Sequence, residues 1–178
     1  MVRLKHRYIL FDILYPPVKN PSTGEQKRKS AAFNKSPRDC LLQLHTQTPA
    51  TVNGRVIVSL LKTVIEDHFG ELASGTVALL IIVKYFSNRT STGIIRCNRT
   101  EFQKVVAALA LVTKLEGYEV VMRCVHVSGT IRKCEDFSIR RNRELMNEIG
   151  KGDDEELLNE LMQLFGKHDD ADEGDDEM

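Results

Sequence analysis

Apolar and polar residues follow patterns along the first half of the chain that predict a strand, a helix and a hairpin. Residues 7–15 (RYILFDILY) are rich in aromatic and β-branched residues and stop at two prolines, which indicates a strand. Apolar residues recur at three- and four-residue spacing over 55–69, before Gly70, and predict a helix. The almost wholly apolar run 77–86 predicts a central strand, and 92–98 predicts its hairpin partner.

The second half of the chain repeats this order. Thr100, with Gln103 three residues later, matches a capping box and predicts a helix that Gly117 ends. Residues 118–127 alternate between apolar and polar side chains and predict a strand, and a further helix follows over 131–149. The order β-α-β-β-α-β is typical of the ferredoxin-like fold, whose RNA-binding version is the RRM. We therefore predict an α+β, RRM-like domain with an antiparallel sheet and an extra C-terminal helix.

The pattern is interrupted at two places that define the domain organisation. Residues 16–54 contain all five prolines and show no structural period, so we expect a long, partly mobile insertion with room for a helical turn near 40–44. A chain of 178 residues can bury one good core. The prediction is one RRM-like domain over 1–150 and an acidic tail over 151–178. Disorder of the tail and a short amphipathic helix within it are both open.

Charge is divided unequally between these two parts. Residues 1–150 contain 23 Lys and Arg against 13 Asp and Glu, whereas residues 151–178 contain 2 against 12. The net charge of zero for the whole chain therefore conceals a body of +10 and a tail of −10. Because such an excess on a small domain attracts polyanions, nucleic acid is the first partner to consider.

Catalytic and metal-binding patterns do not emerge from the sequence. Cys124 and His126 lie two apart on a predicted strand, but no further Cys or His follows at zinc spacing. The carboxylates of the body are scattered, and the dense ones lie in the tail. We therefore predict no catalytic residue, no metal site and no cofactor bound by the protein.

The cellular setting can also be predicted from the chain. The four cysteines show no paired spacing, and the first residues lack the apolar core of a signal peptide. The longest apolar run is much shorter than a membrane helix requires. A reducing, intracellular compartment without a membrane segment is the expectation.

The predicted hairpin tip carries the first group of candidate RNA contacts. It gathers cations, hydroxyls and an amide, which are the usual groups for phosphate and sugar contacts. An ordinary polar β-turn is an equally good explanation of the tip alone, but Arg96 and Arg99 just beyond it favour binding. The candidate RNA-binding residues here are Lys84, Ser87, Asn88, Arg89, Thr90, Ser91, Thr92 and Arg96.

A second group lies where a strand passes through a glycine turn into the last helix. Backbone N–H groups at a helix N-terminus favour an anion, and Thr130 is the expected cap. On a helical wheel, basic residues of 131–149 lie opposite an apolar arc that contains Cys134 and Phe137. A merely solvated basic face is the alternative. The candidates are Ser128, Gly129, Thr130, Arg132, Lys133, Arg140, Arg141 and Arg143.

Two sheet features limit how RNA and protein partners could bind. Residues 93–97 contain no aromatic side chain where an RRM stacks bases, so base stacking is disfavoured. One side of the first predicted strand presents Tyr8, Leu10 and Leu14, which are too apolar to remain exposed to water. We therefore expect a protein partner to cover Tyr8, Leu10 and Leu14.

Three blocks of sequence resemble a known family. They are residues 1–11 (MVRLKHRYILF), 84–97 (KYFSNRTSTGIIRC) and 127–137 (VSGTIRKCEDF), the last followed by Arg140-Arg141-Asn142. Together they closely resemble the small RRM-like protein subunit of eukaryotic and archaeal ribonuclease P and ribonuclease MRP, the "processing of precursor" subunit five. The resemblance covers roughly residues 1–15 and 55–149.

The resemblance implies a function for the whole chain. It implies a non-catalytic subunit that binds and stabilises the catalytic RNA of ribonuclease P or MRP, for precursor tRNA 5′-leader removal and precursor rRNA processing. It further implies that the RNA subunit cleaves with Mg²⁺, and that a TIM-barrel-like subunit and a second small RRM-like subunit are partners in the nucleus and nucleolus. The alternatives are a ferredoxin-like adaptor that contacts only proteins and a stand-alone metal-dependent nuclease.

Overall fold

The computed structural model describes residues 5–17, 33, 37–78 and 80–149. The chain divides into two units, Met1–Cys134 and Glu135–Met178. The sheet and the helices that form its core belong to the first unit. The last helix, α6 (Ile131–Ile149), begins in the first unit, and its remainder is the described part of the second.

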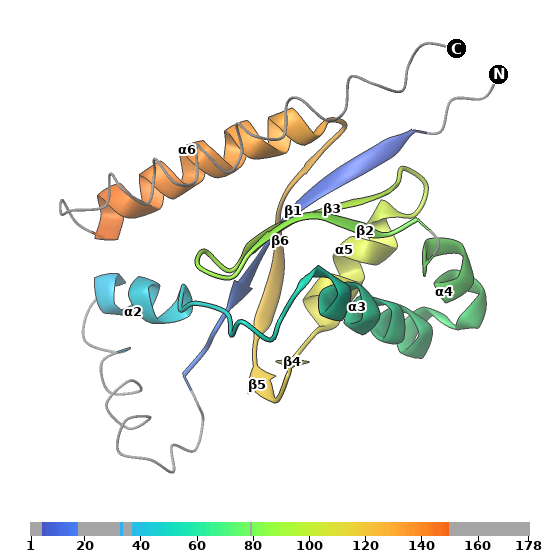
Figure 1. Cartoon of the computed structure of the whole chain (residues 1–178), viewed down its shortest axis with the longest axis horizontal. Coiled ribbons are helices and arrows are strands. Elements are labelled where there is room, and N and C mark those ends of the chain that lie inside the picture. The colour runs from blue at the N-terminus through green and yellow to red at the C-terminus, as the bar shows by residue number, and fades with distance from the viewer. Residues whose placement is uncertain (1–4, 18–32, 34–36, 79, 150–178) are drawn as a thin grey trace. The chain divides into compact units, whose positions relative to one another are not determined.

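Four strands form one antiparallel sheet. They are β1 (His6–Leu14), β2 (Ile82–Ser87), β3 (Thr92–Asn98) and β6 (Val121–Ser128), in the spatial order β2-β3-β1-β6 (Figure 1). Because β1 lies between β3 and β6, the first and last strands are neighbours although they are far apart in sequence. This order, with a helical crossover in each half, confirms the predicted ferredoxin-like fold and antiparallel sheet.

Two helices, α3 (Gly54–Phe69) and α5 (Phe102–Leu111), contact each other and pack with the sheet in one hydrophobic core (Figure 1). Alternate residues of β1 point to these helices because strand side chains alternate between faces. The buried core includes Ile9, Phe11 and Ile13 of β1, Ile57, Leu61 and Ile65 of α3, and Val105, Ala108 and Leu109 of α5. The side chain of Asn53 accepts hydrogen bonds from the amides of Arg55 and Val56, which caps the start of α3.

The strand predicted over 77–86 is wrong in its first part. Residues up to Ala78 form helix α4 (Glu71–Ala78), and β2 begins only at Ile82. Val77 and Ile81 are nevertheless buried in the core, as their apolar character suggests. A short apolar run is compatible with a buried helix or a buried strand, so periodicity alone could not separate the two.

The capping box predicted at Thr100 is also wrong. Helix α5 begins at Phe102 behind Glu101, whose backbone (φ −109°, ψ 0°) differs from the extended conformation of a capping Ser or Thr. The helix ends at Leu111, well before the predicted stop at Gly117. The predicted strand 118–127 starts as the short β5 (Tyr118–Glu119) and continues, after the buried Val120, as β6.

Gly117 instead lies in a tight hairpin turn between β4 (Lys114–Leu115) and β5. Glu116 (φ 49°) and Gly117 (φ 84°) both have positive φ, as a two-residue type I′ turn requires.

Gly117→Ala should lower the free energy of unfolding by about 1 kcal/mol, because a Cβ is disfavoured at positive φ. Urea denaturation would measure the loss. Gly75→Ala in α4 is the control, since its added Cβ meets open space among the described residues and alanine favours helix. Equal losses in both variants would contradict the backbone explanation.

The region predicted as a partly mobile insertion contains regular structure at its C-terminal end. Helix α2 (Pro37–Leu44) extends beyond the predicted turn near 40–44, and residues 45–53 form hydrogen bonds with the β2–β3 turn. Residues 37–54 therefore contain a helix and a hydrogen-bonded loop, and the mobility of the insertion stays a prediction. Residues 18–32 and 34–36, like the tail 151–178, lie outside the described residues. None of the described helices is long and apolar enough to cross a membrane.

Candidate nucleic-acid interface

The β2–β3 turn separates the first predicted group into exposed and buried residues. Arg89 is exposed at its tip, and Lys84, Ser87 and Thr90 are half-buried. Ser91 is fully buried, and Thr92 is 5% exposed. Ser91 and Thr92 therefore present little side-chain surface in the chain without RNA. All the RNA contacts predicted at this turn stay predictions.

Hydrogen bonds explain why these polar side chains are turned inward. The Asn88 amide donates to the carbonyl oxygens of Pro49 and Val52 at 2.8 and 2.9 Å. The hydroxyl of Thr92 donates to the carbonyl oxygen of Thr90 at 2.9 Å. Asn88 and Thr92 therefore stabilise the turn, and the phosphate contacts predicted for them stay predictions.

Arg96 does not lie beside this turn, although the sequence places it in the same group. In the sheet register, Tyr8 of β1 is opposite Arg96 on one side and Ser128 on the other. The turn lies at the other end, where Asp12 is opposite Thr92. Tyr8 and Asp12 are four residue steps apart along the strand, or roughly 13 Å. The β2–β3 turn and the strand-to-helix turn of residues 128–133 thus occupy opposite ends of the sheet (Figure 1), and Arg96 lies at the same end as the strand-to-helix turn.

The end of the sheet where β1 begins and β3 and β6 end gathers cations from distant parts of the sequence. The backbone N–H of Arg99 donates to the carbonyl oxygen of Lys5 at 2.9 Å, so these two exposed residues are neighbours. The Arg7 guanidinium donates to the carbonyl oxygen of His6 at 3.1 Å. It also lies close to Gly129, because a Cβ added to that glycine would be 3.5 Å from Nη1 of Arg7. We call this region the cationic end; its cations are Lys5, Arg7, Arg96, Arg99, Arg132 and Lys133.

Lys5 and Arg7 were absent from the residues predicted to bind RNA. Arg7 was assigned only to a strand, and nothing in its local spacing indicates that it meets Gly129. The signal that could have revealed it is the antiparallel pairing of the first and last strands, which the ferredoxin-like order implies. Both residues also lie in the first of the three family-like blocks, 1–11.

The turn that leads into α6 is partly occupied by its own hydrogen bonds. Ser128 is 7% exposed, and its hydroxyl oxygen accepts the backbone N–H of Thr130 at 3.3 Å. The amide of Thr130 is therefore engaged within the turn and does not face outward as predicted, whereas the anion contacts predicted for the other amides of this turn stay predictions. Gly129 and Thr130 are themselves exposed.

The first turn of α6 is fastened to β1. The buried Cys134 thiol lies 3.4 Å from the carbonyl oxygen of Tyr8, to which it donates. This contact holds the exposed Arg132 and Lys133 at the cationic end. Figure 1 shows that the chain passes from β6 into α6 beside the start of β1. Helix α6 begins at Ile131, directly after Thr130, as the sequence predicts.

The predicted basic stripe continues along the part of α6 in the second unit. Arg140 and Arg143 are exposed, in agreement with the polar arc of the predicted wheel, and Arg141 is half-buried. The Arg140 guanidinium lies 5.9 Å from the centre of the Phe137 ring, a cation–π distance. These cations are thus presented on a regular helix, and their contact with RNA stays a prediction.

The predicted protein-binding side of β1 is largely covered. Leu10 is fully buried and Leu14 is 8% exposed, whereas Tyr8 is half-buried. Leu10 and Leu14 are thus shielded within the chain itself, and the protein partner predicted to cover this side stays a prediction. Asp12 on the same strand is also buried, and its carboxylate accepts two hydrogen bonds from Arg123, the shorter at 3.1 Å.

Nucleophilic and metal-binding chemistry finds little support among the described residues. Burial raises the pKa of the Cys97 thiol to about 12, which leaves it without the thiolate that a nucleophile needs. Burial also raises the pKa of Cys124, whose thiol donates to the backbone oxygen of His126 at 4.0 Å. No three His, Cys, Asp or Glu side chains gather as metal ligands in the described part of the chain.

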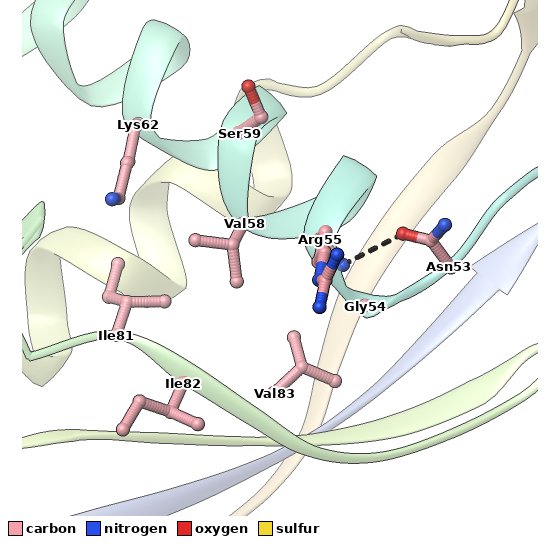
Figure 2. Close-up of a pocket in the computed structure, with 9 residues that line it drawn as sticks. All are labelled: Asn53, Gly54, Arg55, Val58, Ser59, Lys62, Ile81, Ile82 and Val83. Carbon is pink, nitrogen blue, oxygen red and sulfur yellow. Dashed lines mark hydrogen bonds between the residues drawn. The ribbon is translucent and has the colours of Figure 1, made fainter.

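A groove between α3 and β2 is a further surface that sequence reasoning missed (Figure 2). Its volume is about 680 Å³, and Arg55 and Lys62 of α3 line it above an apolar floor that includes Ile82, which is 42% exposed. The groove could hold an anionic group with an apolar part. Its walls come from two elements that are distant in sequence, so neither spacing nor local composition reveals it. The lining residues are Asn53, Gly54, Arg55, Val58, Ser59, Lys62, Ile81, Ile82 and Val83.

Comparisons with known proteins agree with the resemblance found in the three sequence blocks. The model of the Rpp14/Pop5 family matches residues 7–139. The ribonuclease P/MRP protein subunit POP5 of Saccharomyces cerevisiae is 40% identical over 150 residues, which cover 84% of this chain and 82% of the relative. The subunit of the same name from Schizosaccharomyces pombe is 35% identical over 154 residues, covering 86% and 97%, and that of Homo sapiens is 29% identical over 147, covering 80% and 73%. The chain therefore belongs to the Rpp14/Pop5 family.

Proposed function

We propose that this chain is a non-catalytic protein subunit of the ribonuclease P and ribonuclease MRP ribonucleoproteins, in which it binds and stabilises the catalytic RNA. The observation that carries the proposal is the cationic end, where Arg7 meets Gly129 and Arg96 aligns with Ser128 across β1. Its relatives bear the name of a ribonuclease P/MRP protein subunit. The geometry and the family therefore favour the same function.

Electrostatics explains how such a surface binds RNA without a catalytic group. Each Lys or Arg that neutralises a phosphate releases condensed counterions, so binding strengthens with the number of contacts and weakens with salt. Phosphate contacts fix the position of a protein on the RNA without reading its sequence. Arg96 and Ser128 lie opposite Tyr8 on its two sides, so the strands bring Arg96 to the same end as the strand-to-helix turn that carries Arg132 and Lys133.

The proposal assigns the chemistry of cleavage to the RNA subunit, with Mg²⁺ bound by the RNA. The substrates are precursor tRNA, whose 5′ leader is removed, and precursor rRNA in the MRP form. The protein partners are a TIM-barrel-like subunit and a second small RRM-like subunit, in the nucleus and nucleolus. Tyr8, the partly exposed residue of the predicted partner-binding side, is the best candidate for a protein contact there.

Copurification tests this function. The full chain, tagged and isolated from the cells that naturally produce it, should carry a discrete RNA, and the isolate should cleave precursor tRNA in the presence of Mg²⁺. Nuclease treatment should abolish both. Retention of protein partners without any RNA would favour the adaptor, and cleavage by the purified chain alone would favour a protein nuclease.

A further inference from the structure

The β2–β3 turn contains a non-glycine residue in a conformation that needs support. Ser91 has φ 52°, which belongs to the left-handed region that side chains other than glycine seldom adopt. Its hydroxyl donates to the carbonyl oxygen of Thr46 at 2.8 Å and accepts from the hydroxyl of Thr48 at 2.9 Å. Its carbonyl oxygen accepts the amide of Ile13 at 2.8 Å. Three hydrogen bonds to two distant segments therefore hold Ser91 in place.

The other side of the same turn is held by the same segment. The side-chain amide of Asn88 donates to the carbonyl oxygens of Pro49 and Val52, as described above. The backbone carbonyl oxygen of Asn88 accepts the backbone N–H of Thr48 at 2.9 Å. Asn88 and Ser91 flank Arg89 and Thr90. Both ends of the turn are thus bonded to residues 45–53, which we call the clamp segment, while Arg89 remains exposed.

The clamp segment is itself anchored to the core at both ends. The Leu44 carbonyl, just before it, accepts the backbone N–H of Tyr15 at 3.0 Å, and the Tyr15 hydroxyl donates to Thr48 at 3.0 Å. Burial raises the pKa of Tyr15, so its hydroxyl stays protonated and can donate. At the other end Val52 is buried in the core, and Asn53 caps α3. The segment can therefore transmit the rigidity of the core to the turn.

We propose that the clamp segment positions the β2–β3 turn for RNA, with Thr48, Asn88 and Ser91 as positioning residues and Arg89 as the residue that contacts phosphate. This inference rests on the proposed RNA-binding function. A turn held in its bound shape loses less conformational freedom on binding, which strengthens binding without any new contact. It also gives a function to part of the region that the sequence predicts to be a mobile insertion.

A double-mutant cycle tests this positioning role. Thr48→Val keeps the side-chain shape but removes the hydroxyl that links Tyr15 to Ser91, and Arg89→Ala removes the contact that it should position. The affinity of the full chain would be measured for in vitro transcribed ribonuclease P RNA of Saccharomyces cerevisiae. Thr48→Val should weaken binding roughly three- to tenfold. On an Arg89→Ala background, Thr48→Val should cause almost no further loss of RNA affinity, because the positioning acts only through Arg89.

The conservative variant Thr48→Ser retains the hydroxyl and should bind nearly as well as the unchanged chain. Thermal denaturation would show that each variant is folded at the assay temperature. Tyr15→Phe, which removes only the outermost hydroxyl, provides a milder second variant that should show the same dependence on Arg89.

Several outcomes would overturn the inference. Equal losses from Thr48→Val with and without Arg89 would indicate a general structural role. If Arg89→Ala binds normally while replacement of Arg132 and Lys133 abolishes binding, the clamp inference fails and the RNA-binding function stands. If the unchanged chain does not bind the RNA, both fail.

Discussion

Replacing Arg132 and Lys133 together by alanine is expected to weaken RNA binding and to lower its dependence on salt. Both side chains are exposed at the cationic end, and the Cys134–Tyr8 hydrogen bond fixes the helix turn that carries them. If each contacts one phosphate, the slope of log K against log salt should decrease by about one unit per contact. Between 50 and 200 mM salt, the unchanged chain should then lose roughly tenfold more affinity than the variant.

Filter binding or fluorescence anisotropy over a salt series would measure this slope with the same yeast ribonuclease P RNA. A charge-matched control is Lys104→Ala with Lys114→Ala, which removes two cations from α5 and β4, outside both predicted groups. The salt slope of this control should stay close to that of the unchanged chain. If the Arg132 and Lys133 variant keeps the full slope, these residues do not contact phosphate.

Gly93→Ala is expected to lower the free energy of unfolding by about 1–3 kcal/mol, because the core offers no space for the added methyl group. A Cβ at this position would lie 2.6 Å from Cζ and 2.7 Å from Cε1 of Phe11, and 3.0 Å from the Tyr85 carbonyl oxygen. Phe11 is fully buried and stacks on Phe86 with ring centres 6.3 Å apart. The ring cannot withdraw without disturbing the core. Urea denaturation of the full chain would measure the loss.

A smaller partner should relieve this overlap. On a Phe11→Leu background the ring atoms nearest Gly93 are absent, so Gly93→Ala should cost clearly less than it does beside phenylalanine. Phe11→Leu alone is the matched control for the cavity that the smaller side chain leaves. Strictly additive losses in the double variant would show that Phe11 is not the obstacle.

Gly93 also illustrates a limit of the sequence. In the sequence, Gly93 follows the polar residues of the predicted hairpin tip. Nothing in this order of residues indicates that an aromatic ring packs on the glycine. The register of the sheet sets Phe11 opposite Gly93. Only this pairing explains why the position needs a residue without a side chain. The sequence predicts Gly117 as the stop of a helix, whereas it lies in a hairpin turn, and no pattern indicates that Gly93 is a packing residue.

Local patterns were reliable where a single element decides its own structure. The strand over 92–98 and the helix that ends before Gly70 occur where the sequence predicts them, because polar or glycine residues bound each apolar pattern. The patterns failed near 77–81, where an apolar run fits either a helix or a strand. They also failed at Thr100, where a matching motif lies just outside the helix that forms.

The sequence by itself determined the basic character of the body, the types of most elements, the ferredoxin-like order and the family. Only the tertiary structure decided which charged and polar groups act together. Pairing of β1 with both β3 and β6 brings Arg96 into line with Ser128 and Arg7 against Gly129, and hydrogen bonds to residues 45–53 turn Ser91 inward. The physical reason is that periodicity records which side of its own element a residue occupies, whereas strand register and burial depend on contacts between segments far apart in the chain.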